Sequence, residues 1–316
     1  MTIGNSAKSA IAWSKETNYG EFAAPTKPMG AHQVLTPAVR ANVQEIRQTG
    51  SSRDPAFLMK ALQERSFTLD TYVVDGVPLA LALEKITNVA TSGSGTYIHT
   101  IDPAGHSDKN SLDSFTLEYG NEDLDTMQRY LGCMVNTLTL SCAGFETPLM
   151  ATMDCIAREV VPLSWSQRAQ VSVHTTTPHK HSTNQLQFND TDFDGAVDTW
   201  NYRVSNALQA IPDAAGATDL IKYCLPGNRS HECTLTLRPN TKSLWEALIN
   251  CTDQTEISFK YTRAANDTLE IVGYGSVKPN EGGLEHPADV GPINLPITLL
   301  IQKTKVIVTN SSASFY

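Results

Sequence analysis

Residues 131–157 read LGCMVNTLTLSCAGFETPLMATMDCIA, and this stretch decides the fold. Up to Cys142 its residues alternate with a period of two, which is the spacing of side chains on a half-buried strand. Gly144 interrupts the pattern, and a second alternating run follows from Leu149. We therefore expect a β-hairpin or bulged pair with one apolar face and one hydroxyl-rich face. The first face would hold Asn136, Leu138, Leu140, Cys142, Leu149, Ala151, Met153 and Cys155, and the second Val135, Thr137, Thr139, Ser141, Met150, Thr152, Asp154 and Ile156.

A comparable stretch lies near the C-terminus, where residues 289–309 read DVGPINLPITLLIQKTKVIVT. It holds two β-rich runs, at 296–302 and 305–309. Each of the two stretches closes a similar series: a strand, a loop, a strand, a short helix and a further strand. The expected strands are 42–48, 65–74 and 114–119 in the first series and 198–205, 231–237 and 256–262 in the second, with helices at 77–87 and 242–250.

The spacing of matched residues favours an internal duplication. Leu69 and Leu235 lie 166 residues apart, while Leu79 and Leu244, each near the start of an expected helix, lie 165 apart. The alternative is that a β-rich chain of this length can be divided into two similar halves without any duplication.

The duplication predicts four segments. Residues 1–36 would form an extended N-terminal arm, because its prolines interrupt both ladders and helices. The first β domain would span 37–160 and the second 196–316, separated by a linker at 161–195. Within the first domain, residues 88–112 contain SGSG and are expected to form a loop.

Composition excludes several classes of protein. The chain of 316 residues is 41% hydrophobic and 18% charged, which suits a globular protein with a substantial core. Its net charge is −9, and no basic patch typical of a nucleic-acid reader is visible. No apolar run approaches the roughly 18 residues that span a bilayer, and the N-terminus lacks the apolar core of a signal peptide. We expect a soluble protein made in a cytoplasm.

The cysteines show neither a metal-binding nor a redox spacing. No two of them form a CxxC pair, and several occupy apolar strand positions, where a free thiol behaves as a small hydrophobe. Buried thiols are therefore expected rather than disulfides. The six are Cys133, Cys142, Cys155, Cys224, Cys233 and Cys251.

An acidic run provides one candidate metal site. Asp190, Asp192 and Asp194 alternate before Gly195, and Asp198 follows. Alternate carboxylates before a glycine can surround a hard cation with oxygens, as in the first half of an EF-hand loop. The predicted ligands of a structural calcium ion are these four aspartates. The alternative is an acidic turn entering a strand, because the last ligand position holds an Asn and the flanks resemble strands.

Histidines suggest two weaker candidate sites. One cluster is His174, His179 and His181, and the other is His99, Asp102, His106 and Asp108. Both lie in expected loops, which hold metal ligands poorly in place. The sequence contains none of the GxSxG, Walker, HExxH or GxGxxG motifs. We therefore expect no enzyme activity and no cofactor beyond the possible calcium ion.

Several segments together resemble the tail tube proteins of long-tailed bacterial and archaeal viruses. At residues 12–26, AWSKETNYGEFAAPT places an aromatic residue and a Glu before a Tyr-Gly step, as in that family. Further similar segments are NVQEIRQTGSSRDP (42–55), RSFTLDTYVVDG (65–76), VNTLTLSCAGFETPLMATMDCIARE (135–159), WNYRVSNAL (200–208) and LPITLLIQKTKVIVTN (295–310).

The resemblance implies a mainly β fold, a tail-tube-type barrel or sandwich with short flanking helices. It implies a structural virion protein that self-assembles into stacked rings, forming the hollow tail through which viral double-stranded DNA is ejected. A duplicated fold implies a trimeric ring with pseudo-sixfold symmetry, although a hexamer is possible. The implied partners are the tape-measure, tail terminator and baseplate proteins, with no membrane insertion.

The residues themselves are compatible with this function, because long strands with Thr-rich faces leave open edges that neighbouring copies can pair. The Pro-rich arm and residues 88–112 are the expected contacts between rings. Two alternatives stay open. One is a distal-tail or baseplate hub protein of the same fold, and the other is a calcium-stabilised β-sandwich that binds carbohydrate.

Overall fold

A computed structural model gives the structure of residues 9–46, 57–105, 111–142, 147–172, 175–180, 184–193, 195–213, 220–239, 246, 254–283 and 293–315. The helix expected at 242–250 lies outside these residues except for Glu246. Also outside the described residues are Asp194, His174, His181, His106, Asp108 and Cys251.

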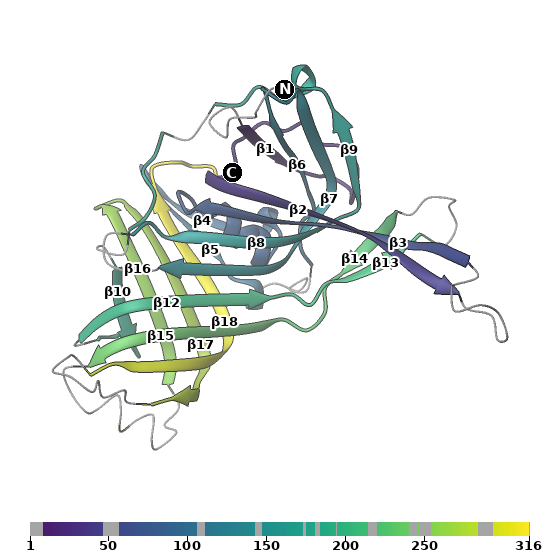
Figure 1. Ribbon diagram of the computed structural model, residues 1–316. Coiled ribbons are helices and arrows are strands. Elements are labelled where there is room, and N and C mark those ends of the chain that lie inside the picture. The colour runs from purple at the N-terminus through teal and green to yellow at the C-terminus, as the bar shows by residue number, and fades with distance from the viewer. Residues whose placement is uncertain are drawn as a thin grey trace.

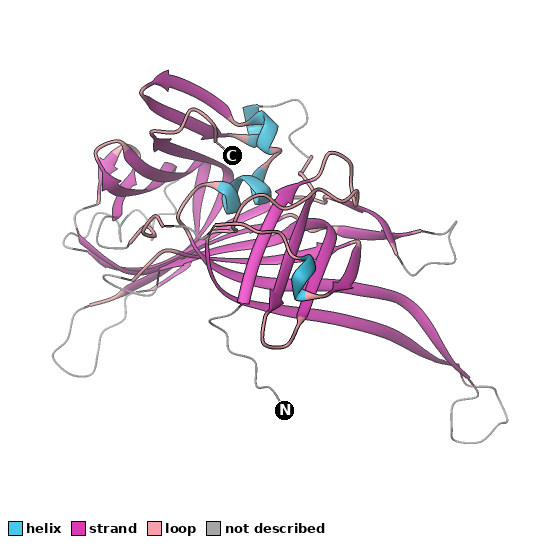
Figure 2. Cartoon of the chain, turned by 90° about the horizontal axis from the view of Figure 1, so that it is seen from above, coloured by secondary structure: helices cyan, strands magenta, loops and turns pink. Residues whose placement is uncertain are grey.

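The chain is mainly β, as expected (Figures 1 and 2). Its helical elements are α1 (Val77–Leu83) and the short 3-10 turns η2 (Ile86–Asn88), η3 (Pro103–Gly105) and η4 (Trp165–Gln167). The strands are β1 (Ser9–Lys15), β2 (Ala31–Ile46), β3 (Phe57–Tyr72), β4 (Ala90–Ser94), β5 (Thr96–Ile101), β6 (Phe115–Asn121), β7 (Thr126–Cys142), β8 (Met150–Ala157), β9 (Glu159–Leu163), β10 (Asn184–Phe188), β11 (Thr191–Asp192), β12 (Gly195–Ser205), β13 (Gln209–Pro212), β14 (Ile221–Leu225), β15 (Ser230–Pro239), β16 (Gln254–Ala264), β17 (Asp267–Gly282) and β18 (Leu295–Asn310).

One antiparallel sheet runs through most of these strands, and the same strand order occurs twice within it. The order is β7-β8-β3-β2 in the first half of the chain and β17-β18-β15-β12 in the second. The two sets join where β12 pairs with β7, which gives a continuous eight-stranded arc, β17-β18-β15-β12-β7-β8-β3-β2. The arc is not a closed barrel, so the sandwich-like form of the expected fold is the observed one.

Irregularities of the backbone also recur in the two sets. In β7 the register against β8 shifts between Val135 and Thr137, so Asn136 is a bulge. In β17 the register against β18 shifts between Pro279 and Glu281, so the bulged residue is again an asparagine, Asn280.

A second bulge recurs in the partner strands. Gln33 is passed over where β2 pairs with β3, and Asp198 where β12 pairs with β15. Moreover, β7 contains Gly132 (φ 64°) and β17 contains Gly275 (φ 93°). Left-handed backbone is accessible to Gly at little cost, which permits both positive φ values. The same strand order and the same pair of bulges therefore occur twice in the described residues, and we call the two sets the first and the second repeat.

The bulge at Asn136 corrects the expected division of β7 into faces. Val135 was expected on the hydroxyl-rich face, but it is fully buried, as is Cys133. Leu138, Leu140 and Cys142 are buried as expected. One extra residue reverses the alternation, so both runs of apolar side chains enter the same core.

Three further expectations were wrong in detail. Residues 88–112 are not simply a loop, because β4 and β5 form a hairpin whose β5 pairs with β18. The two runs at 296–302 and 305–309 form one continuous strand, β18, whose partner is β17. The strand expected at 42–48 is the end of the 16-residue β2, which forms a long hairpin with β3. This hairpin projects beyond the rest of the sheet in both views (Figures 1 and 2).

Two segments that were expected to lie outside the β domains contain paired strands. Within the expected arm, β1 pairs with β6 along its whole length, and the Trp13 side chain is 1% exposed. The arm is therefore packed into the body over this strand rather than extended from it. Within the expected linker, β10 pairs with β16 at the edge of the second repeat.

The core passes without interruption through both repeats. Trp200 of β12 stacks on Phe259 of β16, with ring centroids 4.6 Å apart, while Phe67 of β3 packs against Tyr130 of β7. Helix α1, expected from Pro78 at its first turn, packs against β7 and has every residue buried. Because each repeat contributes to one core, the arc behaves as a single curved layer with a covered and an uncovered face.

Candidate functional site

The uncovered face of the arc is rich in hydroxyl and charged groups. Register places residues of successive strands side by side along it. One row runs from Asp70 through Thr152, Thr139 and Arg203 to Glu232. We call this surface the polar face, defined by Thr68, Asp70, Thr137, Thr139, Ser141, Thr152, Asp154, Asn201, Arg203, Glu232, Thr234, Glu281 and Thr298.

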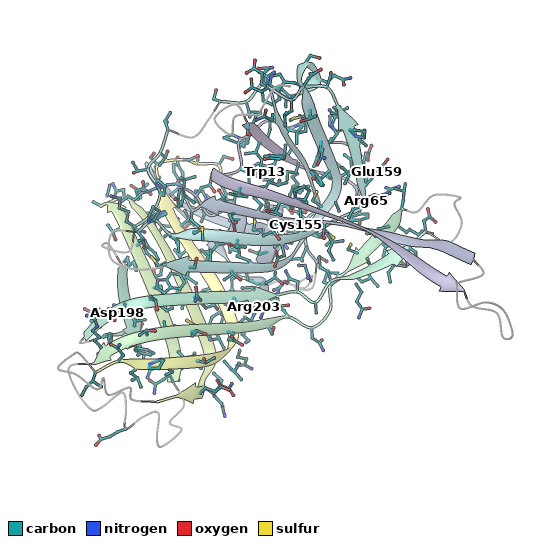
Figure 3. All side chains as sticks on the ribbon, viewed as in Figure 1. Trp13, Arg65, Cys155, Glu159, Asp198 and Arg203 are labelled. Atoms are coloured by element: carbon teal, nitrogen blue, oxygen red, sulfur yellow. The ribbon has the colours of Figure 1, made fainter. Side chains whose placement is uncertain are left out.

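Hydrogen bonds between neighbouring strands order part of this face. The Thr68 hydroxyl donates to Asp154 Oδ1 over 2.7 Å, and the Thr152 hydroxyl donates to Asp70 Oδ1 over 2.6 Å. Such cross-strand pairs stabilise a sheet and fix its register. The row continues from Glu232 through Leu300 to Lys278, so this face has two cations, Arg203 on β12 (Figure 3) and Lys278 on β17, against four carboxylates. The polar face is therefore acidic.

The seam between β12 and β7 is held by asparagines. Its ladder runs from Trp200 opposite Cys142 to Ser205 opposite Thr137. Just beyond it, the bulged Asn136 accepts two hydrogen bonds, one to its backbone oxygen from the N–H of Asn206 (2.8 Å) and one to Oδ1 from the N–H of Leu208 (2.9 Å).

Asn206 is itself a hub, with its side chain 1% exposed. Its Nδ2 donates to the backbone oxygens of Ala82 (2.8 Å) and Val135 (2.9 Å), while its Oδ1 accepts from Arg229 Nε (2.9 Å). Burial lowers the pKa of Arg229. Both donor hydrogens and the oxygen of this buried amide thus have hydrogen-bond partners. The side chain connects the end of β12 to the backbones of α1 and β7.

The arc ends in two open edges. At one end, β2 pairs with β3 alone among the described strands. At the other, β17 continues past its last pair with β16, Gln254 opposite Val277, and residues 279–282 pair as a strand only with β18 in the described structure. Unpaired strand edges are surfaces for addition of a further strand. Open edges were expected from the long Thr-rich strands, but which strands form them could not be predicted, because pairing partners are set by long-range topology.

The four aspartates of the predicted calcium site have separate surroundings. Asp190 lies in a turn with φ 60°, and Asp192 Oδ1 accepts a hydrogen bond from Gln187 Nε2 over 2.8 Å. Asp198, near one end of β12 (Figure 3), pairs with Arg238 over 2.7 Å. Asp194 lies outside the described residues. Among those that are described, no three His, Cys, Asp or Glu side chains form a group that could hold a metal ion. Calcium binding therefore stays a prediction.

The histidine clusters are only partly described. His99 is buried and hydrogen-bonded to Thr91 and Asn310, whereas nearby Asp102 accepts from Tyr274. His179 is buried against the edge of Tyr261, and burial, with Arg263 nearby, lowers its pKa to about 4. Both side chains serve the core. The described cysteines are all buried free thiols, as expected: Cys133, Cys142, Cys155, Cys224 and Cys233.

Comparison with known families identifies the chain. The profile of a family described as phage tail tube protein matches residues 6–299, which include both repeats. The chain belongs to this family. No match was found among curated proteins. Within the described residues of this tail tube protein, no helix is long and apolar enough to cross a membrane.

Membership gives the early motif residues a structural meaning. Glu16, which precedes the Tyr19-Gly20 step, is 3% exposed and its carboxylate accepts four hydrogen bonds. The donors are the N–H groups of Gly20 and Gly132 and the hydroxyls of Ser114 and Thr116, at 2.7–3.0 Å. This carboxylate fixes the chain after β1 against β6 and β7.

Proposed function

We propose that this tail tube protein assembles with copies of itself into rings that stack into a hollow, DNA-conducting tail. One observation supports the proposal above all: among the described residues, the eight-stranded arc has one open edge along β2 and another along the last residues of β17, beyond its ladder with β16, and it has one uncovered polar face. A sheet with open edges is stabilised when further strands pair with them. A closed circle of identical copies satisfies every such edge.

Strand geometry favours three copies per ring. Three arcs of eight strands form a barrel of 24 strands, whose backbone diameter is about 48 Å for strands about 4.8 Å apart and tilted by about 40°. Side chains reduce the opening to roughly 35 Å, which admits a DNA duplex. Two arcs would leave only about 20 Å, too narrow for a hydrated duplex. Because each copy holds two repeats, a ring of three has pseudo-sixfold symmetry.

The polar face is the surface we assign to the lumen. Its hydroxyls are neutral hydrogen-bonding groups, and its four carboxylates outnumber its two cations, Arg203 and Lys278. DNA phosphates bind proteins mainly through Lys and Arg, so an acidic lining repels the duplex and allows it to slide. The face therefore suits passage of DNA rather than its retention.

Contacts between rings are assigned to two hairpins, one that extends from the end of the arc and one that lies beside it. The projecting part of the β2–β3 hairpin and the β4–β5 hairpin are the main candidates (Figure 1). Tape-measure, terminator and baseplate proteins would occupy the lumen and the two ends. The tube would be made in the host cytoplasm and carried in the virion tail, and the chain would act without catalysis.

Electron microscopy of the purified protein, combined with mass photometry, tests this function. Tubes with rings of three copies are the expected result. Single rings that do not stack would instead indicate a distal-tail or baseplate hub protein. Monomers at high concentration would contradict assembly and favour a calcium-stabilised carbohydrate-binding sandwich, which a glycan-binding assay would then examine.

A further inference from the structure

We propose that the closing contact of the ring pairs β2 of one copy with the end of β17 in the next copy, in the register that β12 and β7 already use within the chain. This inference rests on the proposed function, since it names the two edges that meet. Edge β2 occupies in the first repeat the place of β12 in the second, and β17 occupies the place of β7.

The bulges allow residues of the two repeats to be matched individually. Gln33 corresponds to Asp198, so position 40 of β2 corresponds to Ser205 of β12. Asn280 corresponds to Asn136, so Glu281 of β17 corresponds to Thr137 of β7.

Within the chain, Ser205 lies opposite Thr137, Val204 opposite Leu138 and Arg203 opposite Thr139. The same register between two copies places position 40 opposite 281, position 39 opposite 282 and position 38 opposite 283. Each pair joins residues of neighbouring copies.

Charge complementarity supports this register. Position 40 is an arginine and position 281 a glutamate, whereas the matching pair inside the chain, Ser205 and Thr137, is neutral. Directly opposite residues on antiparallel strands lie close enough to interact, and opposite charges there favour pairing. The contact between copies would therefore contain a pair of opposite charges that the seam within one copy lacks. This difference favours pairing of β2 with β17 of the next copy over pairing with another edge.

Space for the incoming strand supports the same edge. A Cβ atom added at Gly283 would meet no atom within 4 Å. In the matching place inside the chain, β12 already lies alongside β7. The neighbour's β2 would cover this open side.

Cysteine pairs provide a direct test of the register. In Ala38→Cys/Gly283→Cys, mild oxidation should produce disulfide-linked trimers on a non-reducing gel, because opposite Cβ atoms lie within disulfide reach. Thr139→Cys/Arg203→Cys is the matched control for the internal seam. Its disulfide should form within one chain, so the protein should still migrate as a monomer. Ala38→Cys/Lys278→Cys is out of register and should link poorly.

Charge reversal gives an independent readout of the same pair. Arg40→Glu and Glu281→Arg should each weaken ring formation about tenfold, and the double variant should restore it. Rings that form without the 38–283 cross-link, or equal loss in the double variant, would overturn the register while leaving the proposed function intact. A wild-type chain that stays monomeric would overturn both proposals.

Discussion

The backbone N–H of Asn206 donates to the carbonyl oxygen of Asn136 over 2.8 Å, one residue beyond the ladder between β12 and β7. This contact joins the end of a strand in the second repeat to a bulge in the first. The Asn206 side chain then bonds the backbone of both α1 and β7. The two repeats are consequently held by a buried polar junction as well as by their shared core.

Asn206→Ala should destabilise the chain by about 2–4 kcal/mol, because it removes three side-chain hydrogen bonds at a buried site and leaves their partners unsatisfied. Chemical denaturation followed by tryptophan fluorescence measures the change. Asn201→Ala on the exposed face of the same strand is the control and should change stability by less than about 0.5 kcal/mol. Equal losses for both variants would contradict the role given to Asn206.

Glu16→Gln should lower the free energy of unfolding by about 1.5–3 kcal/mol. The amide retains one acceptor oxygen, but its NH₂ group faces donors such as the N–H groups of Gly20 and Gly132. Thermal unfolding monitored by circular dichroism would reveal the loss. The exposed Glu21→Gln provides a comparison and should unfold like the wild type, so a harmless Glu16→Gln would refute this account.

The stability of the fold should decrease in mild acid because of its buried histidines. Burial, then Arg229, lowers the pKa of His231 to about 4, and burial, then Arg263, does the same for His179. Unfolded histidines titrate near 6.5, so between about pH 6.5 and 4 the unfolded state binds more protons.

The stabilisation is therefore complete above pH 6.5 and decreases by up to about 1.4 kcal/mol per pH unit for each histidine as the pH falls toward 4. Denaturant titrations of wild type and His231→Asn at several pH values measure these slopes. The variant should show the shallower dependence, and identical slopes would exclude His231 as a contributor.

Glu232→Lys should make assembled particles retain DNA. The change places a cation beside Arg203 on the polar face, where the register sets position 232 opposite it. Retention should fall steeply as salt increases, since phosphate contacts release counterions. Co-sedimentation with duplex DNA at low salt is the measurement. Glu159→Lys adds the same charge on β9, so retention by that variant alone would place the lumen elsewhere.

Calcium at millimolar concentration should raise the melting temperature if Asp190, Asp192, Asp194 and Asp198 bind the ion. Asp192→Ala should then abolish the shift. Arg238→Ala should increase it, because Arg238 otherwise pairs with Asp198 over 2.7 Å. A wild-type melting curve that does not change with calcium would remove the site from consideration.

Local pattern predicted many of the elements. The alternation in residues 135–157 predicted most of β7 and β8, and Pro78 predicted the start of α1, because both signals depend on neighbours in sequence. Strands near 115, 199, 232 and 257 were found in the same way.

Failures occurred where pairing across the fold overrides local pattern. Ser92 and Gly93 suggested a loop, yet β4 is held by its ladder with β5. Asn136 looked like an apolar-face residue because a bulge cannot be recognised without its partner strand. The seam and the open edges depend on which strands meet, and that information is spread over the whole chain. The paired bulges were visible only once the register was known.

In the proposed ring, linking two repeats in one chain has a consequence for how the circle of copies would form. Half of the contacts between repeats, the β12–β7 seams, are made when the polypeptide folds, at the high effective concentration of a tethered partner. Only the remaining half require collisions between separate molecules, each of which loses translational and rotational freedom. A ring built from tethered pairs of repeats therefore needs fewer collisions between separate molecules than a ring built from single repeats. At low protein concentration this favours complete rings over partial ones.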